Sequence, residues 1–334
     1  MVTSAPRELG CWNNWHSEDQ PLRLGVSSCL LGNNVRFDGG HARDRFVTRT
    51  LGQWFEFVTV CPEVEIGMGT PRPTIRLVDT EEGDVRLVAP STDEDFTDRM
   101  HAFSDEKVAE LQGIDLDGFI FKKGSPSCGM ERIKSYLRGM PSRRNEAGLF
   151  ARRLMDRWPM LPVEEEGRLN DWRLRETFIE RAFCRNRWRT LIAGGATRRR
   201  LVEFHTAHKL LIRAHDETGY QKLGRLVGSA GEISDEELFA EYEREFHAAL
   251  GRKATTKKHV NVLQHAMGYL KKVLDSGEKR EILTAIDEFA EGLLPLVVPL
   301  TLLRYNIRRH DIDYLSGQLY FDPHPKELML RNHA

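Results

Sequence analysis

Three of the five cysteines stand in loops of small or rigid residues, each after a short apolar run. These are Cys29 in LGVSSCLLG, Cys61 in FVTVCPEVEIG and Cys128 in KKGSPSCGM. Thiolates are ligands of soft metal ions and of iron–sulfur clusters, and glycine-rich loops let the backbone approach such a group closely. The pattern therefore indicates a metal or cluster site built from three separated loops.

Spacing alone leaves other interpretations of these cysteines open. A buried cysteine is often only a small core residue, and a zinc ion usually takes four ligands, commonly from paired C-x-x-C units that this chain lacks. Three thiolates without a fourth suit a cubane cluster that leaves one iron open. Cys11 and Cys184 lack comparable surroundings, and we expect both to be free thiols.

The apolar runs before the three cysteines have the length and composition of buried strands. The expected strands are residues 22–27, 54–60, 86–88 and 118–121, and the expected helices are residues 93–112, capped by Ser91 or Thr92, and 149–157. Strands that alternate with helices predict a parallel sheet, in which ligands bind beyond the carboxyl ends of the strands. The three cysteines should therefore converge on one place.

A segment rich in proline and glutamate, residues 159–171, separates two kinds of sequence. Before it we expect a Rossmann-like α/β domain over residues 21–165, preceded by a flexible lead-in over residues 1–20. After it, residues 172–334 show helical periodicity and predict an all-α domain. The helices expected there are 198–218, 235–250, 256–276 and 279–294, with Gly219, Gly251 and Gly277 as helix stops.

The formal net charge of −1 conceals an asymmetry between the two halves of the chain. Residues 1–171 hold 22 basic and 28 acidic side chains, a difference of −6, whereas residues 172–334 hold 27 and 22, a difference of +5. A basic second half indicates a polyanion partner. No apolar stretch approaches the roughly 18 residues of a membrane span, and no basic-then-apolar leader opens the chain, so we expect a cytoplasmic protein without a membrane partner.

At three motifs the chain resembles the TudS-type thiouracil desulfidase family. The matching segments are SCLLG and VRFDG within residues 28–39, CPE at 61–63 and SPSCG at 125–129, and the resemblance covers roughly residues 20–165. The closing segment HPKELMLRNH at 324–333 is similar to the helical domain that is fused to such desulfidases in the RudS family. That family removes sulfur from 4-thiouridine in tRNA.

The resemblance implies a 4Fe-4S cluster held only by Cys29, Cys61 and Cys128, and catalytic roles for Glu63 and Ser125. An open iron is a suitable acceptor for a soft thiocarbonyl sulfur and makes the attached carbon more electrophilic. Glu63 would take a proton from the attacking water, and Ser125 would orient that water or bond the developing tetrahedral centre. Without such roles, the glutamate is a solvated loop charge and the serine a turn residue.

Other polar residues near the motifs are weaker candidates. Arg36 either positions a substrate phosphate or pairs with Asp38. Arg72, between two prolines, suits either anion binding or a structural turn. Lys122 and Lys123 suit either phosphate contact or plain surface.

Basic groups in the helical domain predict that RNA binds there, the alternative being a solvated helix face. The expected RNA contacts are Arg187, Arg189, Arg198, Arg199, Lys257 and Lys258, and a further basic group comprises Arg304, Arg308 and Arg309. The histidines at 205, 208 and 215 share one helix without a partnering cysteine or carboxylate pattern. We expect them in the core or on the surface rather than on a metal.

Three functions follow from these patterns. The first is a non-redox desulfidase that converts 4-thiouridine in tRNA to uridine with release of sulfide. The second is the same enzyme acting on free thiouracil or on 4-thiouridine nucleotides. The third is a non-enzymatic RNA-binding protein whose cysteines hold a metal.

Overall fold

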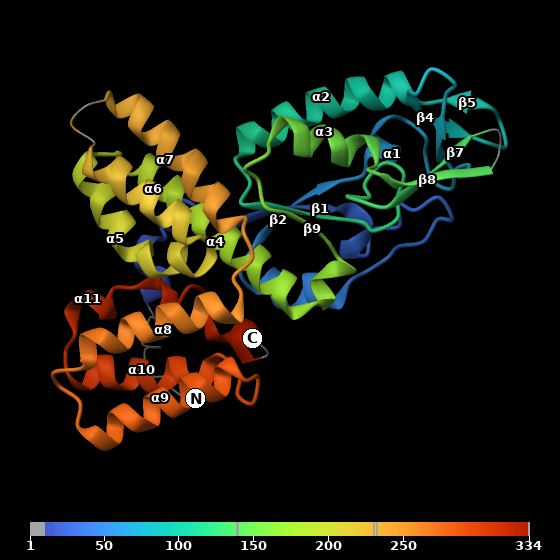
Figure 1. Ribbon diagram of the computed structural model, residues 1–334. Helices are drawn as coiled ribbons and strands as arrows, with labels where there is room; N and C mark the ends of the chain where they lie inside the picture. The colour runs from blue at the N-terminus through green and yellow to red at the C-terminus, as the bar shows by residue number, and fades with distance from the viewer. Residues whose placement is uncertain (1–10, 138–139, 230, 232, 333–334) are drawn as a thin grey trace, which may run out of the picture. The chain divides into compact units, whose positions relative to one another are not determined.

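The computed structural model describes residues 11–137, 140–229, 231 and 233–332. The chain divides into two compact units (Figure 1). One runs over Pro21–Leu174, and the other combines Met1–Gln20 with Arg175–Ala334. The first unit is α/β and the second is all-α, as the sequence predicts. The first unit ends at 174 rather than at the expected 165.

A four-stranded parallel sheet forms the centre of the α/β unit. Its strands, in spatial order, are β2 (Glu56–Val60), β1 (Arg23–Ser27), β6 (Gly118–Phe121) and β9 (Val163–Glu165). The chain adds β2 on one side of β1 and later crosses to β6 on the other side, so the strand order reverses between β1 and β6. Ligands of open α/β sheets bind at such a switch point, beyond the carboxyl ends of the strands.

Close packing of β1 against β6 depends on Gly25. A Cβ atom at this position would lie 2.2 Å from Cδ2 of Phe119, its register partner in β6. Every residue of β6 is buried, which explains why this strand is a continuous apolar run in the sequence.

The structure contains a second sheet, with both parallel and antiparallel strand pairs, which the sequence did not predict. Its strands, in spatial order, are β5 (Glu94–Asp95), β4 (Val85–Ala89), β3 (Arg76–Asp79), β7 (Ile133–Leu137) and β8 (Met140–Glu146). The strand expected at 86–88 lies here, in β4, and pairs antiparallel with β3 instead of joining the parallel sheet. A tight turn, in which Thr80 N donates to Asp84 O at 2.8 Å, joins the two strands. Such a turn leaves no room for the crossover that a parallel pair needs.

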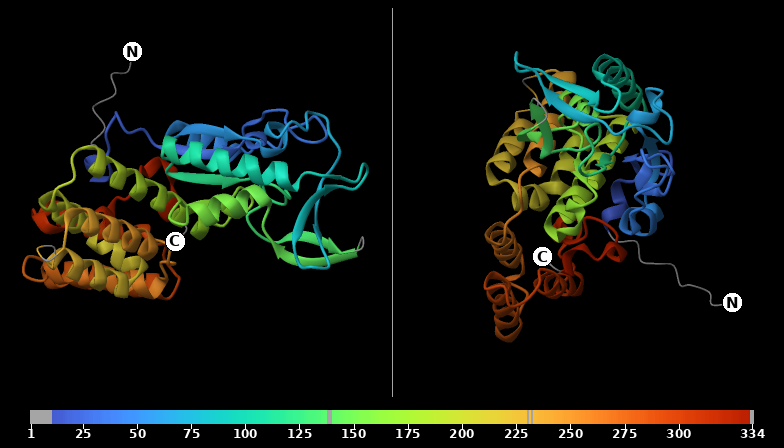
Figure 2. Two further views of the ribbon diagram at one scale, coloured as in Figure 1. Left: turned by 90° about the horizontal axis from the view of Figure 1, so that it is seen from above. Right: turned by 90° about the vertical axis from the view of Figure 1, so that its right-hand side faces the viewer.

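The helices of this unit are α1 (Pro62–Glu65), α2 (Thr97–Ile114) and α3 (Leu149–Arg157). Helices α2 and α3 lie side by side against the core of the unit, as Figures 1 and 2 show. Helix α3 has the expected bounds, whereas α2 begins at Thr97 instead of about 93. The reason is that Glu94–Asp95 form β5, and Asp95 Oδ1 accepts a hydrogen bond from Thr97 N at 2.8 Å. Neither Ser91 nor Thr92 caps this helix.

The all-α unit is built around a core of aromatic and aliphatic side chains that includes Trp188, Phe204, Tyr242 and Phe246. Its helices are α4 (Trp172–Ala193), α5 (Arg198–His215), α6 (Glu217–Gly228), α7 (Asp235–Leu250), α8 (Thr256–Leu270), α9 (Ser276–Ala290), α10 (Val297–Arg309) and α11 (Asp313–Ser316).

Two of the three expected glycine stops in this unit are wrong. Gly219 lies inside α6, because Asp216 ends α5 and its Oδ1 accepts a hydrogen bond from Thr218 N at 3.2 Å. A Cβ atom at Gly219 would lie 2.8 Å from Cβ of Ala249, so this glycine allows α6 to approach α7. Gly277 lies in the first turn of α9, and its N–H donates to Asp275 Oδ1 at 2.7 Å. Gly251 follows α7 as expected.

Residues 11–20 are not a flexible lead-in but part of the all-α unit, while residues 1–10 lie outside the described residues. Cys11–Trp15 form a 3₁₀ turn, and the Trp15 ring meets Phe204 edge-on with the ring centroids 5.3 Å apart. His16 Nδ1 lies 2.5 Å from Asn186 Oδ1. The two tryptophans of this short segment contact Phe183 and Phe204, and this burial opposes the entropy lost when the segment becomes ordered.

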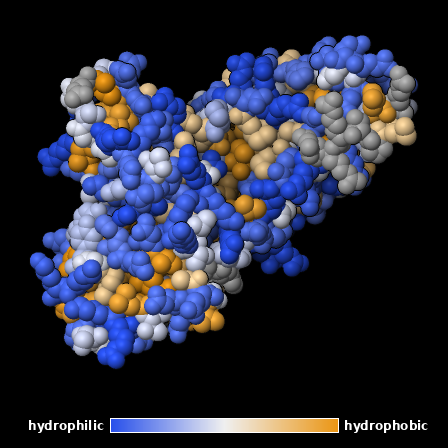
Figure 3. Space-filling model, viewed as in Figure 1, coloured by the Kyte–Doolittle hydropathy of each residue, from blue (hydrophilic) through white to orange (hydrophobic). Residues whose placement is uncertain are grey.

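Within the described chain, no helix has the length and apolar character that crossing a membrane requires. The face of the molecule drawn in Figure 3 is mostly hydrophilic, and apolar side chains reach the surface there in separate groups.

Candidate active site

Three neighbouring strands of the parallel sheet bring the three cysteines to one pocket. Cys29 lies in the 3₁₀ turn directly after β1, Cys61 follows β2 and precedes α1, and Cys128 lies in the loop after β6. All three line a pocket of about 310 Å³, together with Glu63 and Ser125. The convergence expected from the strand ends is therefore present, and it lies at the switch point of the sheet.

The thiols of this pocket are free and difficult to ionise on their own. Burial raises the pKa of Cys29 to about 11, and the neighbouring Cys61 adds to the rise. Burial also raises the pKa of Cys61, and it raises that of Cys128 further, with Glu63 as a second cause. Thiols in such surroundings become thiolates when a cation binds them, because the cation replaces the lost solvation. The donor set therefore fits a positively charged, thiophilic group.

Glu63, in α1, is held by an ion pair with Arg72. Arg72 Nε donates to Glu63 Oε2 at 2.9 Å, and Arg72 Nη2 donates to the same oxygen. The guanidinium is buried and is itself fixed by the carbonyl oxygens of Val35 at 2.9 Å and Gly69 at 3.0 Å. This arrangement fixes the carboxylate and leaves its other oxygen, Oε1, facing the serines of the third motif.

A row of hydroxyl groups connects Glu63 to the loop of Cys128. Ser127 Oγ donates to Glu63 Oε1 at 2.7 Å, and Ser125 Oγ lies 3.2 Å from the same oxygen and 2.9 Å from Ser127 Oγ. Ser125 Oγ also accepts the backbone N–H groups of Ser127 at 3.2 Å and Cys128 at 3.1 Å. Since those bonds use its lone pairs, the hydroxyl hydrogen of Ser125 must point toward Glu63 or Ser127.

Arg72 and Ser127 are the two polar residues of this site to which the sequence analysis assigns no such role. The rigid Pro71-Arg72-Pro73 segment suggests anion binding or a turn, and the structure instead places the arginine charge on Glu63. Ser127 stands between Ser125 and Cys128 in the third motif, and that position is the one sequence signal for it. Ser127 is fully buried, so it positions Glu63 and does not reach solvent.

The weaker candidates of the sequence analysis line the same pocket but have protein partners. Arg36 pairs with Asp38, with Nε 3.4 Å from Oδ1. Lys122 Nζ donates to Glu166 Oε1 at 2.5 Å, and the backbone N–H of Lys123 donates to Glu166 Oε2 at 2.7 Å. These contacts bind the loop before the third motif to the segment after β9, which explains why the α/β unit continues past 165.

Two of the six expected RNA contacts are wrong. Arg187 is fully buried and donates to the carbonyl oxygens of Pro323 and Trp12, and Arg189 is buried with Nη2 3.2 Å from Gln20 Oε1. Neither side chain is available to a phosphate group. Arg187 and Arg189 on α4 point into the interior, where oxygen atoms from distant parts of the sequence accept their hydrogen bonds.

The other four expected RNA contacts differ in how many hydrogen bonds they make within the protein and in how exposed they are. Arg198 donates to Asp235 Oδ1 at 2.6 Å, and Lys258 Nζ donates to the carbonyl oxygens of His215 and Lys253. Arg199 has 88% of its side chain exposed, and Lys257 is exposed. Their binding of RNA stays a prediction.

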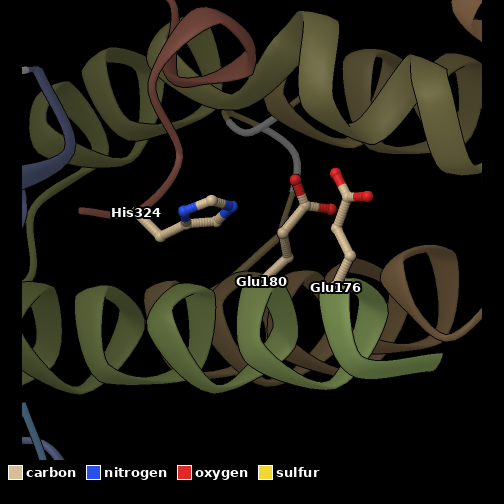
Figure 4. Close-up of side chains that lie close together, drawn as sticks. All are labelled: Glu176, Glu180 and His324. Atoms are coloured by element: carbon tan, nitrogen blue, oxygen red, sulfur yellow. The ribbon is translucent and has the colours of Figure 1, made fainter. Parts of the chain in front are cut away.

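The all-α unit contains a buried group that resembles a cation site, formed by Glu176, Glu180 and His324 (Figure 4). One ligand atom from each residue lies within 4.8 Å of the others. The guanidinium of Arg331 already meets both carboxylates, with Nε 3.3 Å from Glu176 Oε1 and Nη2 2.8 Å from Glu180 Oε1. His215 Nε2 lies 3.1 Å from Glu180 Oε2. The Arg331 guanidinium therefore occupies the place between the two carboxylates, and we read the group as a buried ion-pair network rather than a metal site.

The three histidines of α5 are core residues, in agreement with the sequence analysis. His205, His208 and His215 are buried, and His205 Nδ1 lies 3.0 Å from the Tyr242 hydroxyl. Cys184 is also buried and free, as expected, whereas Cys11 has no described side chain. Burial raises the pKa of Cys184 to about 12.

Comparison with known proteins matches the two halves of the chain separately. The family model described as 2-thiouracil desulfurase matches residues 24–166, and one described as a protein of unknown function, DUF1722, matches residues 209–325. The uncharacterized protein YbgA of Escherichia coli K12 is 29% identical over 165 residues, which are 49% of this chain and 98% of YbgA. The uncharacterized protein YbbK of Bacillus subtilis 168 is 31% identical over 109 residues, 31% of this chain and 71% of YbbK.

Among solved structures, the [4Fe-4S]-dependent thiouracil desulfidase TudS matches with 25% identity and a TM-score of 0.37. The match covers 45% of this chain and 94% of that protein.

Proposed function

The chain belongs to the 2-thiouracil desulfurase family of enzymes, and on this premise we propose that it removes sulfur from 4-thiouridine in tRNA. Water supplies the oxygen of the uridine that is formed, and the sulfur leaves as hydrosulfide, so no oxidant or reductant takes part. The observation that supports the proposal most is the single pocket that holds three free thiols beside a fixed carboxylate.

We propose Cys29, Cys61 and Cys128 as the ligands of a 4Fe-4S cluster. The three thiols come from three loops of one pocket, none is used in a disulfide, and all are soft donors. When bound, such a cluster would supply an open iron as a Lewis acid for the thiocarbonyl sulfur.

The remaining residues of the pocket then have defined tasks. Arg72 fixes Glu63 Oε2, so that Oε1 can accept the proton of a water molecule that attacks the thiocarbonyl carbon. Ser125, whose hydroxyl hydrogen points to Glu63 or Ser127, positions the carboxylate from the side of the third motif together with Ser127. Glu63 then gives the proton that it takes from water to the departing sulfur, which leaves as hydrosulfide. Phe37 lines the pocket with 41% of its surface exposed and offers a flat apolar face to a pyrimidine.

Glu63→Gln is expected to lower kcat by about 10²–10⁴-fold and to leave the iron content unchanged. Glutamine keeps the shape of the side chain and accepts hydrogen bonds, but it cannot take a proton from water. Anaerobic turnover measured by sulfide release, with iron determined on the same sample, checks this.

Glu65→Gln is the matched control, because Glu65 also lies on α1 but pairs with Lys107 at 3.0 Å and does not line the pocket. Its Oε1 accepts the backbone N–H of Cys61 at 2.9 Å, a hydrogen bond that the glutamine oxygen can keep. Its kcat should stay within about threefold of the wild type. A Glu63→Gln enzyme that also stays within that range would exclude Glu63 as the general base.

Comparison of substrates tests the proposed function itself. The holoenzyme, prepared without oxygen, is given thiolated tRNA, 4-thiouridine and free 2-thiouracil, and sulfide release is followed. We expect kcat/KM for thiolated tRNA to exceed that for the nucleoside by more than about tenfold and to fall steeply with added salt, because phosphate contacts release counterions.

Two results would replace the proposal. Equal kcat/KM values for tRNA and nucleoside would make the free base or nucleotide the substrate. An iron-loaded protein that binds tRNA but turns over none of the three compounds would indicate a non-enzymatic RNA-binding protein.

A further inference from the structure

A second pocket of about 310 Å³ lies within the all-α unit, between α10 and the C-terminal segment. Helix α10 contributes Val297, Leu300, Thr301, Arg304 and Arg308, which recur every three or four residues and therefore share one helix face. The opposite wall is formed by residues between Phe321 and Arg331. A volume near the lower end of the range of about 300–1,000 Å³ for ligand pockets suits one small ligand or one nucleotide unit.

The charge of this pocket is positive and is only partly compensated. Arg304 is half-buried, with Nη1 3.8 Å from Asp322 Oδ1. Arg308 and Lys326 are exposed, and neither has an ion-pair partner within the described part of the chain. Three cations therefore face one carboxylate, an excess of +2. Uncompensated cations in a concave, partly apolar site attract anions more strongly than the same charges on an open surface.

Arg331 also lines the pocket, but its guanidinium already has ion-pair partners within the protein. Its guanidinium bonds Glu176 and Glu180 in the buried network described above. It therefore fixes one wall of the pocket, while Arg304, Arg308 and Lys326 are left to meet a ligand.

The backbone at Met329 adds an independent observation. This residue has φ +52°, a left-handed conformation that side chains with a Cβ adopt at a cost. The conformation turns the chain between two 3₁₀ turns, Lys326–Leu328 and Leu330–Asn332, and leaves the Met329 side chain 62% exposed on the pocket wall. Met329 lines the pocket together with Leu300 and Pro323, and its flexible thioether is a surface against which a ribose or base can pack.

We propose that this pocket binds one phosphate-bearing nucleotide unit of the RNA, with Arg304, Arg308 and Lys326 on the phosphate and Met329 against the sugar or base. The proposal rests on RNA being the partner, as proposed above, and it names the place of contact. Of the basic residues of α10, the proposal assigns RNA contact to Arg304 and Arg308 and not to Arg309. Arg309 instead donates to Glu278 at 2.5 Å and does not line the pocket.

The test compares two double variants that remove the same charge from the full-length holoprotein. Arg308→Gln/Lys326→Gln removes the two unpaired pocket cations. Arg280→Gln/Arg309→Gln removes two cations that lie outside the pocket. Affinity for thiolated tRNA is measured at several salt concentrations, and the melting temperature of each variant is measured alongside.

We expect the pocket variant to bind tRNA at least about tenfold more weakly and to lower the salt slope of log K by about 0.7–0.9, the value for one phosphate contact. The control variant should lose less than about threefold. Equal losses in the two variants would mean that only the general charge of the unit matters, and the pocket assignment would be overturned.

Competition with small ligands distinguishes the sources of the phosphate. If RNA is the ligand, uridine monophosphate and inorganic phosphate should displace tRNA only at concentrations at least about a hundredfold above the tRNA Kd. Binding of uridine monophosphate as tight as that of tRNA, and lost in the pocket variant, would make the pocket a free-nucleotide site. A wild-type enzyme that desulfurates tRNA while the pocket variant binds and turns it over normally would refute the pocket and leave the proposed function standing. Failure of the wild type to bind tRNA at all would refute the proposed RNA substrate.

Discussion

Cys29→Ala is expected to abolish iron binding and to reduce sulfur release by more than about 10³-fold. With one of three protein ligands removed, two thiolates remain for a group that needs three to be held, and a metal site seldom survives the loss of a ligand when few are present. Iron and acid-labile sulfide determined per chain after anaerobic reconstitution, together with turnover, check this result.

Cys184→Ser is the matched control for the cysteine replacement. Cys184 is a free, buried thiol in the core of the all-α unit, and it does not line the pocket. The variant should retain the full iron content, at some cost in stability for the buried hydroxyl. A Cys29→Ala protein with wild-type iron content would remove Cys29 from the ligand set.

Acidification from pH 7.5 to 5.5 is expected to destabilise the all-α unit by on the order of 5 kcal/mol. Burial lowers the pKa of His205 and His324 to about 4 and of His259 to about 3, and it lowers the pKa of His208 and His247 further below 6.5. The unfolded chain therefore binds more protons than the folded chain below pH 6.5. The stability that these neutral histidines confer is complete above pH 6.5 and is lost as the pH falls toward 4.

One group in the same unit acts in the opposite direction. Burial, followed by the neighbouring Glu180, raises the pKa of Glu176, so the folded state takes up a proton there at a higher pH than the unfolded state. That contribution is present at low pH and lost as the pH rises. Burial also lowers the pKa of His16 in this unit to about 3, so one proton stands against six and the histidines determine the sign.

Urea denaturation followed by far-ultraviolet circular dichroism at each pH measures this effect, because the all-α unit supplies most of the helical signal. His247→Leu removes one titrating group and should reduce the loss between pH 7.5 and 5.5 by about 1.4 kcal/mol. A wild-type free energy of unfolding that changes by less than about 1 kcal/mol over this interval would contradict the assignment of neutral buried histidines.

The position of the cysteines was predictable because each follows an apolar strand, and parallel strands gather their carboxyl ends at one edge. The fixing of Glu63 was not predictable in this way. Arg72 reaches it only because Arg72 N donates to Phe37 O at 2.9 Å and Arg72 Nη1 donates to Val35 O, which are contacts between distant loops. The sequence suggests a constrained arginine but gives no sign of its partner.

The arginines of α4 show why charge alone does not identify a surface. Helix α4 buries Arg185, Arg187 and Arg189 together with apolar residues on the same helix, so the usual periodicity of a surface helix is missing. Carbonyl groups of Trp12 and Pro323, at opposite ends of the chain, accept the hydrogen bonds of Arg187. Interactions over such sequence separations have no local signature.

The all-α unit is discontinuous in sequence, because residues 11–20 pack with residues that follow 174, and this affects how the chain is made. During synthesis the tryptophan-bearing segment leaves the ribosome before the α/β unit, whereas its partners α4 and α5 emerge after that unit. The α/β unit can therefore fold first, while the tryptophan-bearing segment stays exposed until the rest of the all-α core has been synthesised. Cutting the gene before α4 would leave this segment permanently without partners. To obtain the α/β unit alone, the residues that precede 21 and those that follow 174 must both be removed.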